Sequence, residues 1–192
     1  KNPEEKITFV TKNGLVKQSI LKDFIVSRYS KAMLAFKLKD NDEVIAVNSS
    51  KSRTILISET GYYVNIDTEE IPVVGARASG VKGINLKDDF LVAGLSLGLN
   101  EYLSIFTNNK TAKRIRVSEL ETHNRAKKGS TLMKKVKSFD YKIIKALLTD
   151  GKDELYLKSD NEITKIKNTD ISILDLKSTG GTVIIYFVFA YS

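Results

Sequence analysis

Short runs of apolar residues, each bounded by a polar turn, follow one another along the whole chain. The first two runs, Ile7–Thr11 and Leu15–Leu21, are separated by Lys12-Asn13-Gly14. Asn-Gly is the strongest two-residue hairpin signal, because both positions tolerate a positive φ. The pattern therefore predicts an antiparallel hairpin, and no stretch has the length and 3.6-residue period of an amphipathic helix.

The same order of runs and turns recurs. Alignment of Thr11, Ser58, Thr107 and Lys158 gives spacings of 47, 49 and 51 residues. Four strands are expected in each repeat. In the first three repeats the third strand is predicted at Ala32–Leu38, Val81–Leu86 and Thr131–Val136.

A repeat of about 48 residues with four short strands is typical of a propeller, whose radially packed sheets bury each other's faces. The sequence predicts an all-β fold: one domain over residues 1–192, with blades at about 7–50, 54–100, 102–150 and 154–192. A β-sandwich with accidental spacing is the alternative. The apolar run Val183–Tyr191 is too short to span a bilayer as a helix, which needs about 20 residues, so we expect a buried strand and no membrane span.

Composition removes several classes of function. The chain has no cysteine and one histidine, His123, so thiolate chemistry is excluded and a histidine-based metal site or triad has no partners. We expect His123 to lie in an exposed loop without a special role. No P-loop motif is present, and the first residues, Lys1–Lys6, have neither the cationic start nor the apolar core expected of a signal peptide. We predict no catalytic residue, metal, cofactor or small-molecule substrate, and a cytoplasmic protein. The start without methionine suggests a piece of a longer chain.

The net charge of +8 is concentrated in one segment. Residues 110–145 hold 12 Lys and Arg against three acids, a net charge of +9, so the remaining residues sum to −1. A positive excess confined to one sector is typical of a surface that binds a polyanion.

A basic turn repeats with the same period as the strands. Gly75-Ala76-Arg77-Ala78-Ser79-Gly80-Val81-Lys82-Gly83 has a counterpart in Arg125-Ala126-Lys127-Lys128-Gly129-Ser130 and a weaker one in Arg28-Tyr29-Ser30-Lys31. The arginines lie 48 and 49 positions apart. Glycines in such turns allow backbone N–H groups to approach a phosphate closely.

These repeats resemble the C-terminal domain of the A subunit of bacterial type IIA topoisomerases, gyrase and topoisomerase IV. The resemblance rests on the repeated hairpin and on GARASGVKGINLKDDFLVAG in the second repeat, and it extends from Ile7 to about Ile184. It implies a β-pinwheel, in which neighbouring blades exchange strands. The loop Val26–Ala32 keeps one arginine and one lysine but no glycine of the gyrase box, which favours topoisomerase IV over gyrase.

The resemblance implies a non-catalytic domain that binds and bends double-stranded DNA on its basic rim. It would present a duplex segment to the cleavage core for ATP-dependent strand passage. The implied partners, in the bacterial cytoplasm at the nucleoid, are the ATPase B subunit together with the rest of the A subunit. A gyrase-type wrapping domain and a propeller that docks an acidic protein are the alternatives. The predicted DNA-binding residues are Arg28, Lys31, Arg77, Lys82, Lys113, Arg114, Arg116, Arg125, Lys127, Lys128, Lys134 and Lys135.

Overall fold

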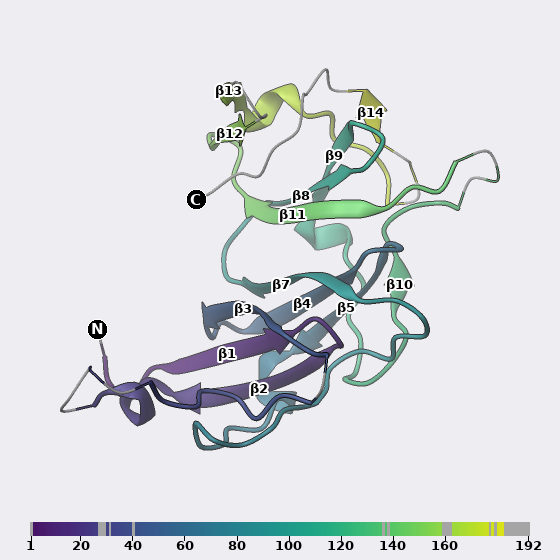
Figure 1. Cartoon of the computed structure of the whole chain (residues 1–192). Helices are drawn as coiled ribbons and strands as arrows, with labels where there is room; N and C mark the ends of the chain where they lie inside the picture. The colour runs from purple at the N-terminus through teal and green to yellow at the C-terminus, as the bar shows by residue number, and fades with distance from the viewer. Residues whose placement is uncertain are drawn as a thin grey trace. The chain divides into compact units, whose positions relative to one another are not determined.

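The computed structural model describes residues 2–26, 30, 32–39, 41–135, 137, 139–158, 163–176, 178 and 180–182. Its regular structure consists of β-strands and short 3-10 turns (Figure 1). Among these residues, no helix is long and apolar enough to cross a membrane. The all-β fold expected from the sequence is confirmed.

Each of the four repeats begins with an antiparallel hairpin. The hairpins are β1 (Lys6–Thr11) with β2 (Leu15–Ile20), β4 (Arg53–Ser58) with β5 (Tyr62–Asp67), β8 (Tyr102–Thr107) with β9 (Thr111–Arg116), and β12 (Glu154–Lys158) with β13 (Ile163–Lys167). The predicted Asn13-Gly14 turn is confirmed, since Gly14 has φ +84° and its N–H donates to the Thr11 carbonyl. In the third hairpin Lys110 takes the corresponding position with φ +56°.

A single 3-10 turn follows each hairpin: η1 (Leu21–Phe24), η2 (Thr68–Glu70), η3 (Val117–Glu119) and η4 (Asn168–Asp170). In the first three repeats a strand of six or seven residues then pairs with the first strand of its own repeat. These strands are β3 (Val44–Ser49) beside β1, β7 (Leu91–Leu97) beside β4, and β11 (Ile143–Thr149) beside β8.

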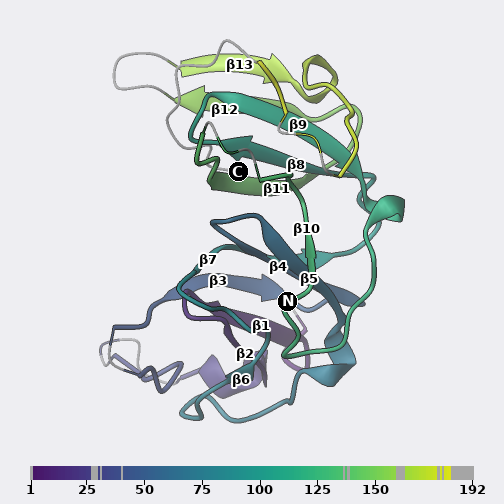
Figure 2. The same ribbon diagram turned by 90° about the vertical axis from the view of Figure 1, so that its right-hand side faces the viewer.

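The fourth strand of three sheets comes from the following repeat. These are the short strands β6 (Val81–Lys82), β10 (Ser130–Thr131) and β14 (Gly181–Thr182). They complete the sheets β3-β1-β2-β6, β10-β5-β4-β7 and β11-β8-β9-β14. Figure 2 shows β6 beside β2. This is the strand exchange that the family resemblance implied.

The predicted third strands are shorter in the structure. Residues 32–38 form no strand, and Val81–Leu86 is a strand only over Val81–Lys82. Beyond Lys82 the backbone turns to other partners, because the Gly83 amide donates to the Gly14 carbonyl and the Asn85 amide to the Lys127 carbonyl. The first bond continues the β2–β6 register by one position to the hairpin turn, and the second lies at an isolated bridge between Ile84 and Lys127, so no longer strand forms.

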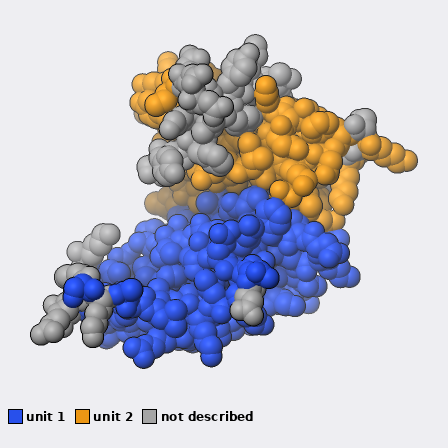
Figure 3. All heavy atoms as spheres, viewed as in Figure 1, with its two compact units in different colours: residues 1–58, 63–98, 121–130 blue, residues 59–62, 99–120, 131–192 orange. Residues whose placement is uncertain are grey.

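Contacts within the chain define two compact units (Figure 3). The first comprises residues 1–58, 63–98 and 121–130, and the second comprises residues 59–62, 99–120 and 131–192. In the first unit Val10, Leu56 and Val64 belong to one buried cluster. A Cβ at Gly94 of β7 would lie 2.6 Å from Val10, so strands from two repeats approach closely. In the second unit Phe106 and Ile171 belong to a smaller cluster.

Candidate nucleic-acid interface

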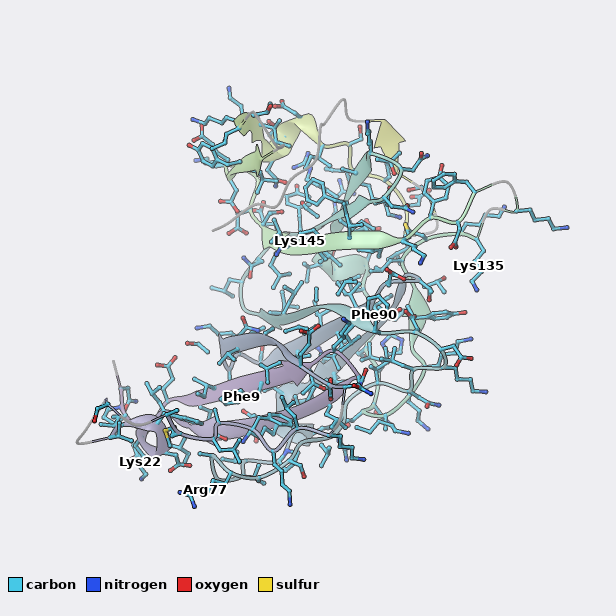
Figure 4. All side chains as sticks on the ribbon, in the orientation of Figure 1. Phe9, Lys22, Arg77, Phe90, Lys135 and Lys145 are labelled. Carbon is cyan, nitrogen blue, oxygen red and sulfur yellow. The ribbon has the colours of Figure 1, made fainter. Side chains whose placement is uncertain are left out.

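The first basic loop, residues 75–80, leads from η2 to β6 and carries Arg77. The Ala78 amide donates to the Gly75 carbonyl, which closes a turn around Arg77. Gly80 then returns against β2, where a Cβ would lie 2.7 Å from the Val16 carbonyl oxygen. Arg77 is exposed on the outside of this turn (Figure 4), and Lys82 is exposed on β6.

The second basic loop, residues 125–128, lies along the segment that follows β6. The Arg125 guanidinium donates to the Lys82 carbonyl at 2.8 Å. The Ala126 amide donates to the Gly83 carbonyl, and Ala126 has φ +63°. Together with the bond from the Asn85 amide to Lys127, these contacts place two basic segments from different repeats side by side.

Four of the predicted residues are therefore gathered in the first unit: Lys82, Arg125, Lys127 and Lys128. We call these four the basic cluster. Lys82, Lys127 and Lys128 are exposed, while Arg125 is half-buried. The backbone of Arg125 is also tied to η2, since its amide donates to the Glu70 carboxylate at 2.9 Å. The loop is thus fixed to the fold by its backbone, which leaves the lysine side chains at the surface.

In the second unit Arg116, Lys134 and Lys135 are exposed. Arg116 lies 3.4 Å from Glu119, an exposed pair of the kind that contributes little to stability. Lys134 and Lys135 border a pocket of about 120 Å³, and the Lys135 side chain extends away from the ribbon (Figure 4). The other residues that line this pocket are Thr60, Met133, Phe139, Asp140 and Tyr141.

Lys113 is among the residues predicted to contact DNA, but the structure places it in the interior. Its side chain is 1% exposed. Its Nζ lies within hydrogen-bond distance of the carbonyls of Leu132 (2.7 Å), Asp175 (2.8 Å), Leu176 (2.7 Å) and Ser178 (2.8 Å), which share its N–H groups. Burial lowers the pKa of Lys113 to about 7, whereas the nearby Asp175 charge raises it. A lysine enclosed in this way does not reach a phosphate.

Arg114 is also buried, with 6% of its surface exposed. Its Nε donates to the Ile171 carbonyl at 2.7 Å, and its guanidinium lies 4.8 Å from the Tyr102 ring centroid. Strand alternation predicts one shared, accessible face for Arg114 and Arg116, yet only Arg116 is accessible. Alternation cannot reveal this, because Arg114 bonds to the segment 171–174, which follows η4 and is distant in sequence. Arg28 and Lys31 lie outside the described residues.

His123 has a structural role that the sequence does not predict. Its Nδ1 accepts the Asn65 amide at 3.3 Å, and its Nε2 lies 3.0 Å from the Ser130 hydroxyl. Its ring packs edge-on against Tyr63, with centroids 5.3 Å apart. Because Nδ1 accepts, Nε2 carries the hydrogen. Only 12% of the side chain is exposed, so the expected exposed loop position is wrong.

Burial is the main influence on the proton affinity of His123. Desolvation lowers its pKa, the Glu121 carboxylate raises it, and the Arg53 charge lowers it again. The Ser130 hydroxyl also donates to Glu121, so His123, Ser130 and Glu121 form one hydrogen-bonded chain at the base of the second basic loop.

Four-stranded antiparallel sheets that exchange their short strands, with exposed cations on the connecting loops, define a propeller-type domain with a basic surface. The chain belongs to the family described as the DNA gyrase C-terminal domain, beta-propeller, which matches residues 5–51, 54–96 and 101–150. The resemblance inferred from the repeated loops is thereby confirmed.

The chain is similar to the A subunit of DNA topoisomerase 4 from Bacillus subtilis (strain 168), with 38% identity over 156 residues. This match covers 80% of the chain but only 19% of that protein, so the chain spans about a fifth of the length of its curated relatives. A crystal structure of the C-terminal domain of DNA topoisomerase IV matches with a TM-score of 0.88 and 32% identity, over 95% of this chain and 58% of that one. The C-terminal domain of DNA gyrase A has a TM-score of 0.83 at 21% identity, over 98% of this chain and 63% of that one, which shows the fold alone.

Proposed function

We propose that this chain is the non-catalytic, DNA-binding part of the A subunit of a topoisomerase of the topoisomerase IV type. It holds a stretch of double-stranded DNA on its basic loops, bends it, and presents it to the cleavage core for ATP-dependent strand passage. Its partners at the bacterial nucleoid are the ATPase B subunit together with the rest of the A subunit. The chain itself supplies no catalytic step.

The observation that carries this proposal is the basic cluster. Hydrogen bonds from the Arg125 guanidinium and from the backbone amides of Ala126 and Asn85 bring cations from two repeats together, and residues 82–85 and 125–128 contain no acid. Several lysines on one surface neutralise adjacent phosphates and release condensed counterions, which gives affinity without base readout. Arg77 and, in the second unit, Arg116, Lys134 and Lys135 also belong to the proposed set. Arg28 and Lys31 stay in it as predictions outside the described residues, whereas Lys113 and Arg114 are removed from it by their burial.

Bending requires several contacts to act together. Smooth bending of a 20–30 bp site costs on the order of 1–6 kcal/mol, which one exposed lysine does not supply. A repeated loop distributes cations over a longer surface, and a longer duplex reaches more of them. The affinity is therefore expected to rise with duplex length, and the ends of a bound long duplex are expected to approach each other.

The test is binding of short and long linear duplexes across a salt series, with bending measured by energy transfer between the duplex ends. Replacement of Lys127 and Lys128 by Glu should weaken binding and reduce the slope of log K against log salt by about 2, since each phosphate contact contributes about 0.9. The matched control is Lys51→Glu with Lys152→Glu, two exposed lysines on other turns with the same change in net charge. Weak binding that is indifferent to length would favour a domain that docks an acidic protein.

A further inference from the structure

Two buried lysines occupy the same place in different repeats. Lys17 is the third residue of β2, and Lys113 is the third residue of β9. Their side chains are 0% and 1% exposed. Within the described residues neither Nζ lies within ion-pair distance of a carboxylate, which is unusual because buried lysines are normally paired.

Backbone carbonyls take the place of the missing counter-charge. The Lys17 Nζ donates to the carbonyls of Gly75 (3.2 Å), Ala76 (2.7 Å) and Ala78 (3.2 Å). The Lys113 Nζ donates to Asp175, Leu176 and Ser178 in the corresponding loop of the last repeat. In both loops the acceptors are the first, second and fourth residues, so the same geometry is built twice from unrelated loop sequences.

The surroundings of Lys17 keep its amine at this position. The Nζ lies 5.1 Å from the Phe9 ring centroid and 5.0 Å from that of Phe36, at distances suited to cation–π attraction. Burial lowers the pKa of Lys17, and the Asp23 charge raises it. Three carbonyls and two rings thus hold one cation between β2 and the loop that follows η2.

The residue between the bound carbonyls is the cation of the first basic loop. Because the carbonyls of Ala76 and Ala78 both turn toward Lys17, the backbone on either side of Arg77 is fixed, while Arg77 itself is exposed. A loop whose backbone is already ordered loses less conformational entropy when it binds a ligand. The corresponding position of the Lys113 loop, residue 177, lies outside the described residues.

We propose that Lys17 is a positioning residue for DNA binding: it orders the loop at residues 75–78 so that Arg77 meets a phosphate. This inference rests on the proposed function. Lys17 does not touch the DNA, and its whole contribution to affinity passes through Arg77. Two residues that act through one contact give non-additive losses when both are replaced.

The experiment is a double-mutant cycle on the full chain, with a long duplex and a salt series. Arg77→Ala should lower the affinity about fivefold near 0.15 M salt and reduce the salt slope by about 0.9, the values for one lost phosphate contact. Lys17→Met removes the amine and keeps an unbranched side chain of similar length. We expect Lys17→Met to lower the affinity in the wild-type background and to have no further effect in the Arg77→Ala background.

Either of two results would overturn the inference alone: wild-type affinity of Lys17→Met, or losses that add in the double variant. If the unchanged chain shows no salt-dependent duplex binding, the proposed function fails and the inference fails with it. Lys17→Gln, which keeps a shorter hydrogen-bond donor, enters the same cycle if Lys17→Met does not fold. Amide exchange at Ala78 provides a second readout, since its bond to Gly75 should open faster in both Lys17 variants and not in Arg77→Ala.

Discussion

The basic loops before β6 and before β10 have the same place in the topology but are held by different chemistry. The loop before β6 closes over a buried cation, Lys17, that binds three of its carbonyls. In the next repeat the third residue of the second strand is Val64, and the loop is held by His123 and Tyr63 instead. The second arrangement needs no buried charge.

This difference separates two requirements of the fold. Each loop must be tied to the preceding hairpin, because its short strand completes that hairpin's sheet. The chemistry of this attachment differs between the repeats. In one loop a lysine amine binds backbone carbonyls, and in the other a histidine imidazole accepts a backbone amide. The cations on the outer side of the loops can therefore change in number without loss of the sheet order.

The largest effect is expected when a lysine replaces Val64, the residue of the second repeat that corresponds to Lys17. Val64→Lys introduces a buried amine at a position where the loop offers His123 in place of a carbonyl cage. We expect a loss of about 4 kcal/mol or more in the free energy of unfolding, since burial of an unpaired lysine shifts its pKa by up to about 3–5 units. Urea unfolding at pH 7 measures this loss.

The control for that variant is Val64→Met, which adds similar volume without charge. It should cost about 1–3 kcal/mol from overpacking. Equal stability of the lysine and methionine variants would mean that the second loop can rearrange around an amine, and the two ties would then be interchangeable.

The next effect concerns two glycines, one in each loop, whose surroundings differ. Gly129 has φ +77°, and a Cβ there would lie 1.8 Å from the Tyr63 carbonyl oxygen. Gly75 in the first loop has no heavy atom within 4 Å of an added Cβ. Gly129→Ala should therefore destabilise the chain by about 3 kcal/mol through strain and backbone clash, whereas Gly75→Ala should be near neutral. Thermal unfolding of both variants tests this, and similar melting temperatures would contradict it.

Much of the architecture was predictable because it depends on local signals. Asn13-Gly14 predicts its own hairpin, and the recurring order of short apolar runs and polar turns gives the repeat. The extent of the third strands was not predictable, because Gly83 and Asn85 bond to loops that are distant in sequence. Strand propensity alone gives no information about such partners.

The candidate site was predictable where charge alone decides and not where burial decides. Lys127 and Lys128 stand in a dense basic stretch and are exposed. Lys113 stands in the same stretch but is buried, because its amine bonds to the Leu132 carbonyl and to carbonyls of a loop that begins 62 residues later, at Asp175. The recurrence of lysine at the third position of β2 and β9 does not by itself reveal this burial, because Lys165 takes the same position in β13 and is exposed.

The smallest effect concerns pH, and it distinguishes the loop tied by His123. Because desolvation lowers the pKa of His123, the unfolded chain binds a proton at a higher pH than the folded chain. Stability is therefore complete above the ordinary pKa of about 6.5 and falls as the pH is lowered through the window beneath it. The slope cannot exceed about 1.4 kcal/mol per pH unit, the value for one proton. Urea unfolding from pH 7.5 to pH 5 measures it against His123→Gln, which does not titrate.

Protonation should also loosen the second loop and leave the first unchanged. A proton on Nδ1 removes the acceptor of the Asn65 amide, while Glu121 partly compensates the new charge. The amide resonances of Asn65 and Ala126 should shift with the His123 titration, whereas that of Ala78 should stay constant, since the tie to Lys17 contains no histidine. If the free energy of unfolding of the unchanged chain varied with pH as it does in His123→Gln, protonation of His123 would not be linked to folding. The two kinds of loop would then differ in chemistry without differing in their response to acid.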